Sequence, residues 1–223
     1  MIKLSVAEDE SFRAHVVTGC RNPRHVALTF DDGISDYTNE LLEILKRYRV
    51  QATFFVLGQT LETNNFFKKT LIRMVREGHV VASHSYNHPD LTSLSKNQIR
   101  DQMERTEVSI QSIIGIRPRL MRPPYGYVNH KVVETLKSLG YVIINWNHDT
   151  NDWRHQDSYG NIVGYVQNQI SFPHFKNEGP IILQHDSLRS SIQLQSGIIR
   201  ILQGKGYEFV SMYECIGEEP YRY

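Results

Sequence analysis

The sequence predicts an α/β protein, built as a (β/α) barrel of about seven parallel strands with helices outside. Short apolar segments alternate with amphipathic segments along the 223 residues, which is the order expected of strand–helix units. The apolar segments are continuous, and such runs indicate a parallel sheet that is buried on both faces. Six or seven units favour a barrel over an open sheet. The length fits a single domain over 1–223, with a core at about 24–212.

The first half of the chain alternates strands with helices. Ser35 or Asp36 can cap the first helix, because short polar side chains accept hydrogen bonds from the free N–H groups of a helix start. Gly58 ends the second strand and Gly78 stops the second helix. The expected strands cover 24–30, 52–57 and 79–83, and the expected helices run to about 48 and over about 66–77.

The second half continues the alternation. Ser95 begins a long helix to about Ile114, whose apolar stripe includes Ile99 and Met103. The other expected helices cover 130–139, about 158–171 and about 190–202. The expected strands cover 119–121, 141–145 and 180–184, with a polar loop at 149–153 and a closing segment at 208–212.

The composition is that of a globular protein, with 40% hydrophobic residues, 22% charged residues and a net charge of +1. This balance gives no reason to expect binding to nucleic acid or to an anionic membrane, which both favour clustered positive charge. No run approaches the ~20 apolar residues of a transmembrane helix. The first ten residues are mixed and acidic, so we expect no signal peptide there. We expect a monomer.

Two cysteines, Cys20 and Cys215, lie near opposite ends of the sequence. Two isolated cysteines are more often buried thiols than a disulfide. Their spacing is not that of metal ligands, which excludes a zinc knuckle.

Reactive side chains follow nearly every expected strand. The carboxyl ends of the strands of a parallel barrel meet at one mouth, so these side chains should converge although they are far apart in sequence. The residues concerned are Asp31, Asp32, His84, His88, Arg122, Tyr125, Asp152 and His185.

The first strand leads directly into Asp31, Asp32 and Gly33. Alternate side chains of a regular strand point to opposite faces, so the two carboxylates should be aimed differently and suit two separate tasks. The same residues also fit a polar turn at a strand end.

His84 and His88 are four residues apart, a spacing that brings two imidazoles to one side of a helical turn. With Asp32 they would form a two-histidine, one-carboxylate set that suits a catalytic divalent metal. Two solvated loop histidines are the alternative. The H-E-x-x-H pattern fails because Ser85 replaces the glutamate base, which leaves Asp31 as the candidate base.

The remaining candidates have similar double interpretations. Arg122 precedes two prolines, which fix backbone angles, so the segment can simply be a stiff loop. Alternatively, Arg122 holds a catalytic carboxylate ionised, and a backbone N–H group of the stiff loop faces a developing oxyanion. His185 leaves a buried strand at the mouth, where it is a core histidine or a catalytic group that Asp152 orients. Trp153 is an aromatic residue that either forms a wall of the site or packs in the core. No G-x-S-x-G, P-loop or G-x-G-x-x-G pattern is present.

Five segments together resemble the five motifs of the polysaccharide deacetylases, the NodB homology domains of carbohydrate esterase family four. They occur in family order over about 26–185. The segments are Thr29-Phe30-Asp31-Asp32-Gly33, His84-Ser85-Tyr86-Asn87-His88-Pro89, Arg122-Pro123-Pro124-Tyr125-Gly126, Asp149-Thr150-Asn151-Asp152-Trp153 and Leu183-Gln184-His185.

The resemblance implies a distorted (β/α) barrel that removes N-acetyl groups from a β-linked amino-sugar polymer, in particular chitin or chitooligosaccharides. It implies that Asp31 is the general base. It also implies that Asp32, His84 and His88 hold a divalent metal, usually zinc, with cobalt as an alternative. Peptidoglycan or acetylxylan as substrate, and a silent wall-binding protein with the same fold, are the competing interpretations.

The resemblance assigns five further roles. Arg122 orients the base, and the backbone N–H of Tyr125 contributes to the oxyanion hole. Asp152 tunes His185, which acts as the general acid. The acetyl pocket is expected to be lined by Pro124, Trp153 and Leu183.

The stretch Thr18-Gly19-Cys20 resembles fungal chitin deacetylases, in which a cysteine near each end forms a disulfide. The resemblance therefore implies a Cys20–Cys215 bridge, against the expectation of two thiols. A disulfide in turn implies an oxidising, extracellular or cell-surface setting. Ile34 departs from the family, which usually has proline at this position.

Overall fold

The computed structural model describes residues 15–154, 164 and 177–222. Its sheet strands are β1 (Val16–Val17), β2 (Gly19–Cys20), β3 (His25–Asp31), β4 (Ala52–Val56), β5 (Val80–Ser83), β7 (Leu120–Met121), β8 (Val142–Ile144), β9 (His148–Asp149), β10 (Gly179–His185) and β11 (Glu208–Phe209). A separate pair is formed by β6 (Arg117–Pro118) and β12 (Tyr221–Arg222).

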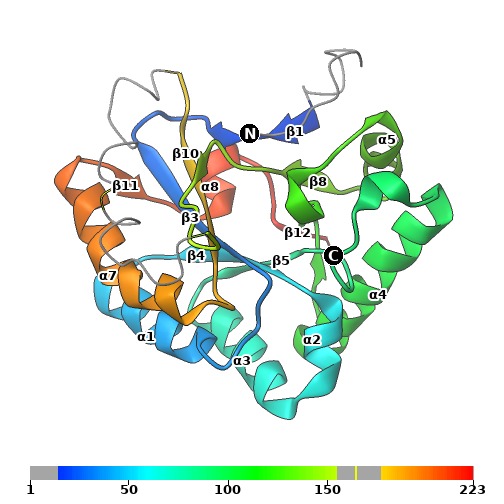
Figure 1. Cartoon of the computed structure of the whole chain (residues 1–223), viewed down its shortest axis with the longest axis horizontal. Helices are drawn as coiled ribbons and strands as arrows, with labels where there is room; N and C mark the ends of the chain where they lie inside the picture. Colours follow the sequence, from blue (N-terminus) through cyan, green and yellow to red (C-terminus); the bar gives the residue numbers. More distant parts are fainter. Residues whose placement is uncertain (1–14, 155–163, 165–176, 223) are drawn as a thin grey trace.

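The helices lie around the outside of the sheet, except α8 (Met212–Ile216), which packs against β2 and β3 near the middle of the view (Figure 1). They are α1 (Thr38–Tyr48), α2 (Gly58–Thr63), α3 (Asn65–Arg76), α4 (Lys96–Ile114), α5 (His130–Ser138), α7 (Arg189–Gly204) and α8 (Met212–Ile216). Two short 3₁₀ turns, η2 (Leu91–Ser93) and η3 (Pro124–Gly126), follow β5 and β7.

The main sheet has the order β1-β8-β7-β5-β4-β3-β10-β2. In this spatial order, the first seven strands, which end with β10, are parallel to their neighbours. The last strand, β2, is antiparallel to β10. β1 and β2 occupy opposite edges of the sheet, yet only Thr18 separates them in sequence. The segment 16–20 therefore bridges the two edges and nearly closes the sheet, which confirms the predicted distorted barrel.

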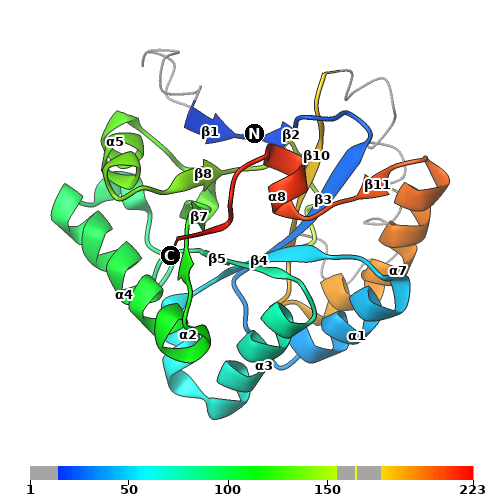
Figure 2. The ribbon, with the colours of Figure 1, turned by 180° about the vertical axis from the view of Figure 1, so that it is seen from behind.

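Both faces of the central strands are apolar, which explains the continuous hydrophobic runs. Leu28 and Phe30 of β3 belong to the core between the sheet and helices α1, α3 and α7. Ala27 of the same strand packs with Phe55 and Ile181 in a second core on the other face. Figure 2 shows the ring of helices from the opposite side.

Several element bounds differ from the sequence-based expectation. Helix α1 begins at Thr38, because the Ser35 hydroxyl instead donates to the carbonyl oxygen of Asp186 at 2.6 Å. The opening segment contains β1 and β2, which pair only with distant strands. Gly58 begins the unexpected helix α2 instead of only ending a strand. The helix expected over 158–171 lies, apart from Gly164, outside the described residues.

A disulfide joins Cys20 of β2 to Cys215 of α8, with a sulfur–sulfur distance of 2.08 Å. Both residues are fully buried, and the N–H of Arg21 also donates to the Cys215 carbonyl at 2.8 Å. The bridge implied by the resemblance is confirmed, and the expectation of two thiols is wrong. Within the described ranges, every helix is too short or too polar to cross a bilayer.

Candidate active site

A cavity of about 480 Å³ opens where the central strands end. Residues from the ends of β3, β5 and β10, and from the loops after β7, β8 and β9, surround it. The lining residues are Asp31, Asp32, His84, His88, Tyr125, Tyr127, Trp146, Asp149, Asn151, Trp153, Arg154, Leu183 and His185. The reactive side chains that the sequence places at strand ends thus lie around one space.

Asp32, His84 and His88 form a cluster whose potential ligand atoms all lie within 4.8 Å of one another. Asp32 Oδ1 is 3.5 Å from Nε2 of His84 and 3.5 Å from Nε2 of His88. This oxygen is buried and has no hydrogen-bond partner among the described residues. A buried carboxylate oxygen that faces two imidazole nitrogens fits a divalent cation.

The surroundings of His84 prepare it for metal binding. Its Nδ1 lies 2.8 Å from the carbonyl oxygen of Arg122. A carbonyl can only accept, so Nδ1 carries the hydrogen and Nε2 keeps its lone pair. Burial lowers the pKa of His84 to about 3, which keeps the ring in the neutral form that binds metals.

The backbone bends sharply where these side chains enter the cavity. Asp32 has φ 70°, so it leaves the alternation of β3 and its carboxylate faces the same cavity as that of Asp31. Left-handed φ angles also occur at Ser85, His88, Tyr125 and Asn151. Among the described non-glycine residues, only Arg49 at a helix end shares this conformation elsewhere. Such strained residues cluster at functional sites.

Asp31 is held by the fully buried side chain of Arg122. Arg122 Nη1 donates to Asp31 Oδ1 at 2.8 Å and to the Thr29 hydroxyl at 2.7 Å. Arg122 Nη2 donates to the carbonyl of Asn145 at 3.2 Å. Burial raises the pKa of the Asp31 carboxyl, although the Arg122 charge acts in the opposite direction. The carboxylate is therefore both oriented and more basic than usual.

His185 lies beside Asp31, because the two residues are paired positions on neighbouring strands. Its Nδ1 is 2.8 Å from Asp152 Oδ1, and its backbone N–H donates to Asp152 Oδ2 at 2.8 Å. Burial opposes a charge on the ring. The hydrogen bond that the ring donates to Asp152 and the charges of Asp152, Asp31 and Asp32 outweigh burial and raise the pKa of His185 to about 9. The ring is thus a protonated acid at neutral pH.

The turn η3 carries Tyr125, which is 54% exposed and has φ 60°. Its ring meets the ring of His88 edge-on, with centroids 4.5 Å apart. The Asn145 amide donates to the carbonyl of Gly126 at 3.1 Å and holds the turn in place. A Cβ at Gly126 would approach the Trp146 ring to 2.6 Å, so glycine is required there.

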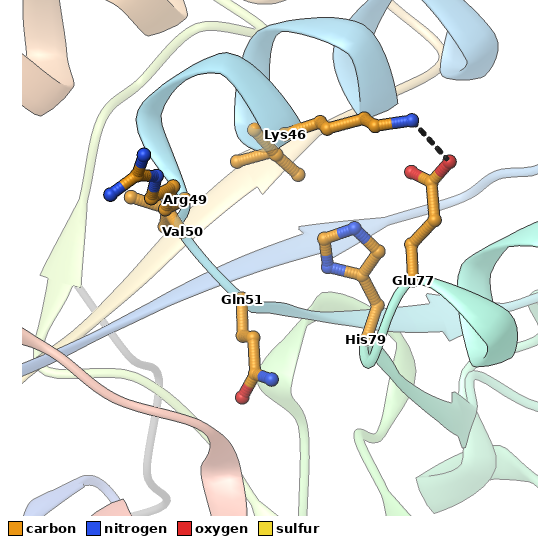
Figure 3. Close-up of a pocket in the computed structure, with 7 residues that line it drawn as sticks. Lys46, Arg49, Val50, Gln51, Glu77 and His79 are labelled. Carbon is orange, nitrogen blue, oxygen red and sulfur yellow. Dashed lines mark ion pairs between the residues drawn. The ribbon is translucent and has the colours of Figure 1, made fainter.

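A second cavity of about 320 Å³ lies at the amino ends of β4 and β5, away from the strand ends that carry the reactive residues. Figure 3 shows the His79 ring pointing toward helix α1, while Gln51 points away from it. His79 Nδ1 accepts the N–H of Ala52 at 3.1 Å, and burial lowers the pKa of His79 to about 4. This neutral histidine completes the backbone pairing of β4, which is a structural role.

The family model described as polysaccharide deacetylase matches residues 18–144, more than half of the sequence. The chain belongs to the polysaccharide deacetylase family. It is therefore a member of a family of hydrolases that act on N-acetyl amide bonds.

Three similar proteins illustrate the relationship. The chain is 36% identical to a chitin deacetylase of Pestalotiopsis sp over 91% of this chain and 67% of that protein. It is also 36% identical to a peptidoglycan-N-acetylglucosamine deacetylase of Listeria monocytogenes, over 94% of this chain but only 42% of that protein. The solved chitin deacetylase of Colletotrichum lindemuthianum superposes with a TM-score of 0.87 and 35% identity, covering 93% of this chain and 95% of the other.

The cavity of this polysaccharide deacetylase contains most, but not all, of the expected residues. Arg122 and Asp152 are buried behind Asp31 and His185 and act on them directly. Pro124, expected in the acetyl pocket, is buried and is not among the described residues that line the cavity.

Sequence reasoning missed several residues of the site. Trp146 follows β8, so the rule that functional residues follow strands could have found it, and Asp149 at the end of β9 lies in one of the five motifs but received no role there. Thr29 and Asn145 contact Arg122 inside the barrel, and no local pattern in the sequence distinguishes them from ordinary strand residues.

Proposed function

We propose that this chain hydrolyses the N-acetyl groups of N-acetylglucosamine residues in chitin or chitooligosaccharides. The observation that carries the proposal is the placement of Asp31 and His185 on neighbouring strand ends, next to the Asp32–His84–His88 cluster. Chitin is favoured as substrate because the TM-score and identity with the Colletotrichum chitin deacetylase, 0.87 and 35%, exceed the 0.82 and 32% found for a solved peptidoglycan N-acetylglucosamine deacetylase.

The cluster would hold a divalent cation, and we expect zinc, with cobalt as an alternative. Asp32, His84 and His88 supply one oxygen and two nitrogens, which leaves further positions open. When bound, such a cation polarises a carbonyl group and lowers the pKa of a water molecule.

Two groups of the chain transfer protons, and a third stabilises the developing oxyanion. Asp31 accepts the proton of the water that attacks the acetyl carbon, and Arg122 holds the carboxylate in position. The N–H of Tyr125 donates to the oxyanion that develops on the carbonyl oxygen. His185 gives its proton to the amide nitrogen as the C–N bond breaks, so the products are acetate and a free amine. Trp153 and Leu183 form walls that exclude water around the acetyl methyl group.

The same chemistry on peptidoglycan is the second candidate, because the similarity to the Listeria enzyme is as high as that to the Pestalotiopsis enzyme. A catalytically silent wall-binding protein is disfavoured by the His185–Asp152 pair, which simple binding does not need. The disulfide supports an oxidising, extracellular or cell-surface location.

Metal analysis combined with acetate release tests the function. We expect one zinc ion per chain and acetate release from chitooligosaccharides above that from peptidoglycan or acetylxylan. A chelator should abolish release, and zinc or cobalt should restore it. A zinc-loaded protein that releases no acetate from any of these polymers would contradict the proposal.

The pH dependence should report the Asp152–His185 pair. Activity should fall as the pH rises through the pKa of His185, because only the protonated ring can donate to the leaving nitrogen. Asp152→Asn removes the charge that raises this pKa, so the alkaline limb of kcat/KM should move about 1 to 3 units to lower pH. An alkaline limb that does not move would show that another group is the acid.

A further inference from the structure

Helix α4 has a row of polar side chains on the side that faces helix α2 and the loop 84–88, and this loop carries two of the three proposed metal ligands. The helix packs beside α2 on the outside of the barrel (Figure 1). Gln102, Arg105 and Ser109 share this side of α4, at helical spacing. From the sequence alone, these polar residues indicate an ordinary solvent-exposed face of a helix.

Gln102 contacts the loop backbone directly. Its Oε1 accepts the N–H of Tyr86 at 3.0 Å and the N–H of Asn87 at 3.2 Å. These two N–H groups lie between His84 and His88. The Gln102 side-chain oxygen therefore fixes the backbone segment that sets the distance between the two imidazoles.

The loop conformation needs such support. Ser85 and His88 have φ angles of 69° and 62°, a left-handed conformation that costs free energy in non-glycine residues. The Ser85 hydroxyl accepts the N–H of His88 at 3.1 Å within the loop. A strained turn persists only when its surroundings hold it.

Helix α2 holds the complementary groups of the same loop. The first two N–H groups of the helix, of Gly58 and Gln59, donate to the carbonyls of Ser85 and Tyr86 at 3.1 and 3.0 Å. The side chain of Tyr86 is fixed as well, because its hydroxyl donates to Glu62 at 2.7 Å. Thus α2 donates hydrogen bonds to two carbonyl groups of the loop, while Gln102 of α4 accepts hydrogen bonds from two of its N–H groups.

We propose that Gln102 is a positioning residue for the metal centre, which fixes the spacing of His84 and His88 by accepting hydrogen bonds from the N–H groups of Tyr86 and Asn87 between them. The inference rests on the proposed function, since it needs the cluster to bind a cation. Partners that orient metal ligands typically change metal affinity about 10–100-fold when they are removed.

Zinc affinity of the metal-stripped protein, measured by competition with a chromophoric chelator, tests this role. Gln102→Met keeps the length of the side chain but has no strong acceptor, and it should weaken zinc binding about 10–100-fold. Gln102→Ala should do the same, while Gln102→Glu retains an acceptor oxygen and should restore most of the affinity. Gln111→Met is the matched control, because it makes the same substitution nine residues further along helix α4, away from the loop.

Thermal unfolding of the metal-free variants separates positioning from general stability. A purely structural Gln102 would lower the unfolding temperature and leave the zinc dissociation constant unchanged, and that result would overturn the proposal. Absence of zinc binding in the unmodified chain would overturn the metal centre itself, and this role with it. Zinc binding weakened in Gln102→Met but not in Gln111→Met supports the proposal.

Discussion

Asp31→Asn should lower the rate of acetate release about 10²- to 10⁴-fold while the protein still binds zinc. Asparagine has nearly the same shape as aspartate but cannot take up the proton of the attacking water. The proposed ligands Asp32, His84 and His88 are unchanged, so the metal content should stay at one ion per chain. Acetate release from chitooligosaccharides and metal analysis of the same sample check both parts.

Asp32→Asn is the matched control for this experiment. It makes the same chemical change one residue along the chain, at the oxygen that lies 3.5 Å from both histidine nitrogens. This variant should lose zinc affinity first, and activity only as a consequence. If Asp31→Asn kept its rate, the base would lie elsewhere; if it lost zinc, Asp31 would be a metal ligand.

Arg122→Met should destabilise the fold by about 3–5 kcal/mol and also inactivate the protein. Arg122 is fully buried, and its loss leaves the Asp31 carboxylate buried with no positive partner at 2.8 Å. Chemical denaturation monitored by circular dichroism measures the change in the free energy of unfolding. A loss below about 0.5 kcal/mol, the range of an ordinary surface substitution, would contradict the proposed role of the pair.

The pH dependence of this loss identifies its origin. Burial already raises the pKa of Asp31 in the folded state, and removal of Arg122 should raise it further. The uncompensated charge exists only above that folded pKa, so the destabilisation should be full above it and shrink as the pH falls below it toward the ordinary pKa of an aspartate. The double variant Arg122→Met with Asp31→Asn should recover part of the stability, because it also removes the unpaired charge.

The strands and long helices of this fold can be predicted from local sequence. Strands β3, β4, β5 and β10 are continuous apolar runs, and each lies within about two residues of its expected place. Helix α4 begins after Ser95, which forms a capping box with Gln98. Helix α8 has the same signal in Ser211 and Glu214, so the sequence contained the information for it.

Helix α2 could not be predicted in this way, because its start has no side-chain cap. Its first N–H groups are paired by carbonyls of the loop 84–88, a partner that only the folded chain brings near. The residues of the candidate site also divide into those that local sequence reveals and those that only the folded structure reveals. Asp31, His84 and His185 follow strands and are visible in the sequence, whereas Asn145 and Gln102 act through contacts between distant segments.

The bridging segment 16–20 has a consequence for the order in which the chain can be assembled. Val16 pairs with Ile143 of β8, and Gly19 pairs with Pro180 of β10, so both partners are synthesised long after the segment itself. Cys20 must wait still longer for Cys215, 195 residues downstream. β1 and β2 thus precede the other described strands in the chain but cannot pair until β8 and β10 have been made, and the two edges of the sheet stay unpaired until then.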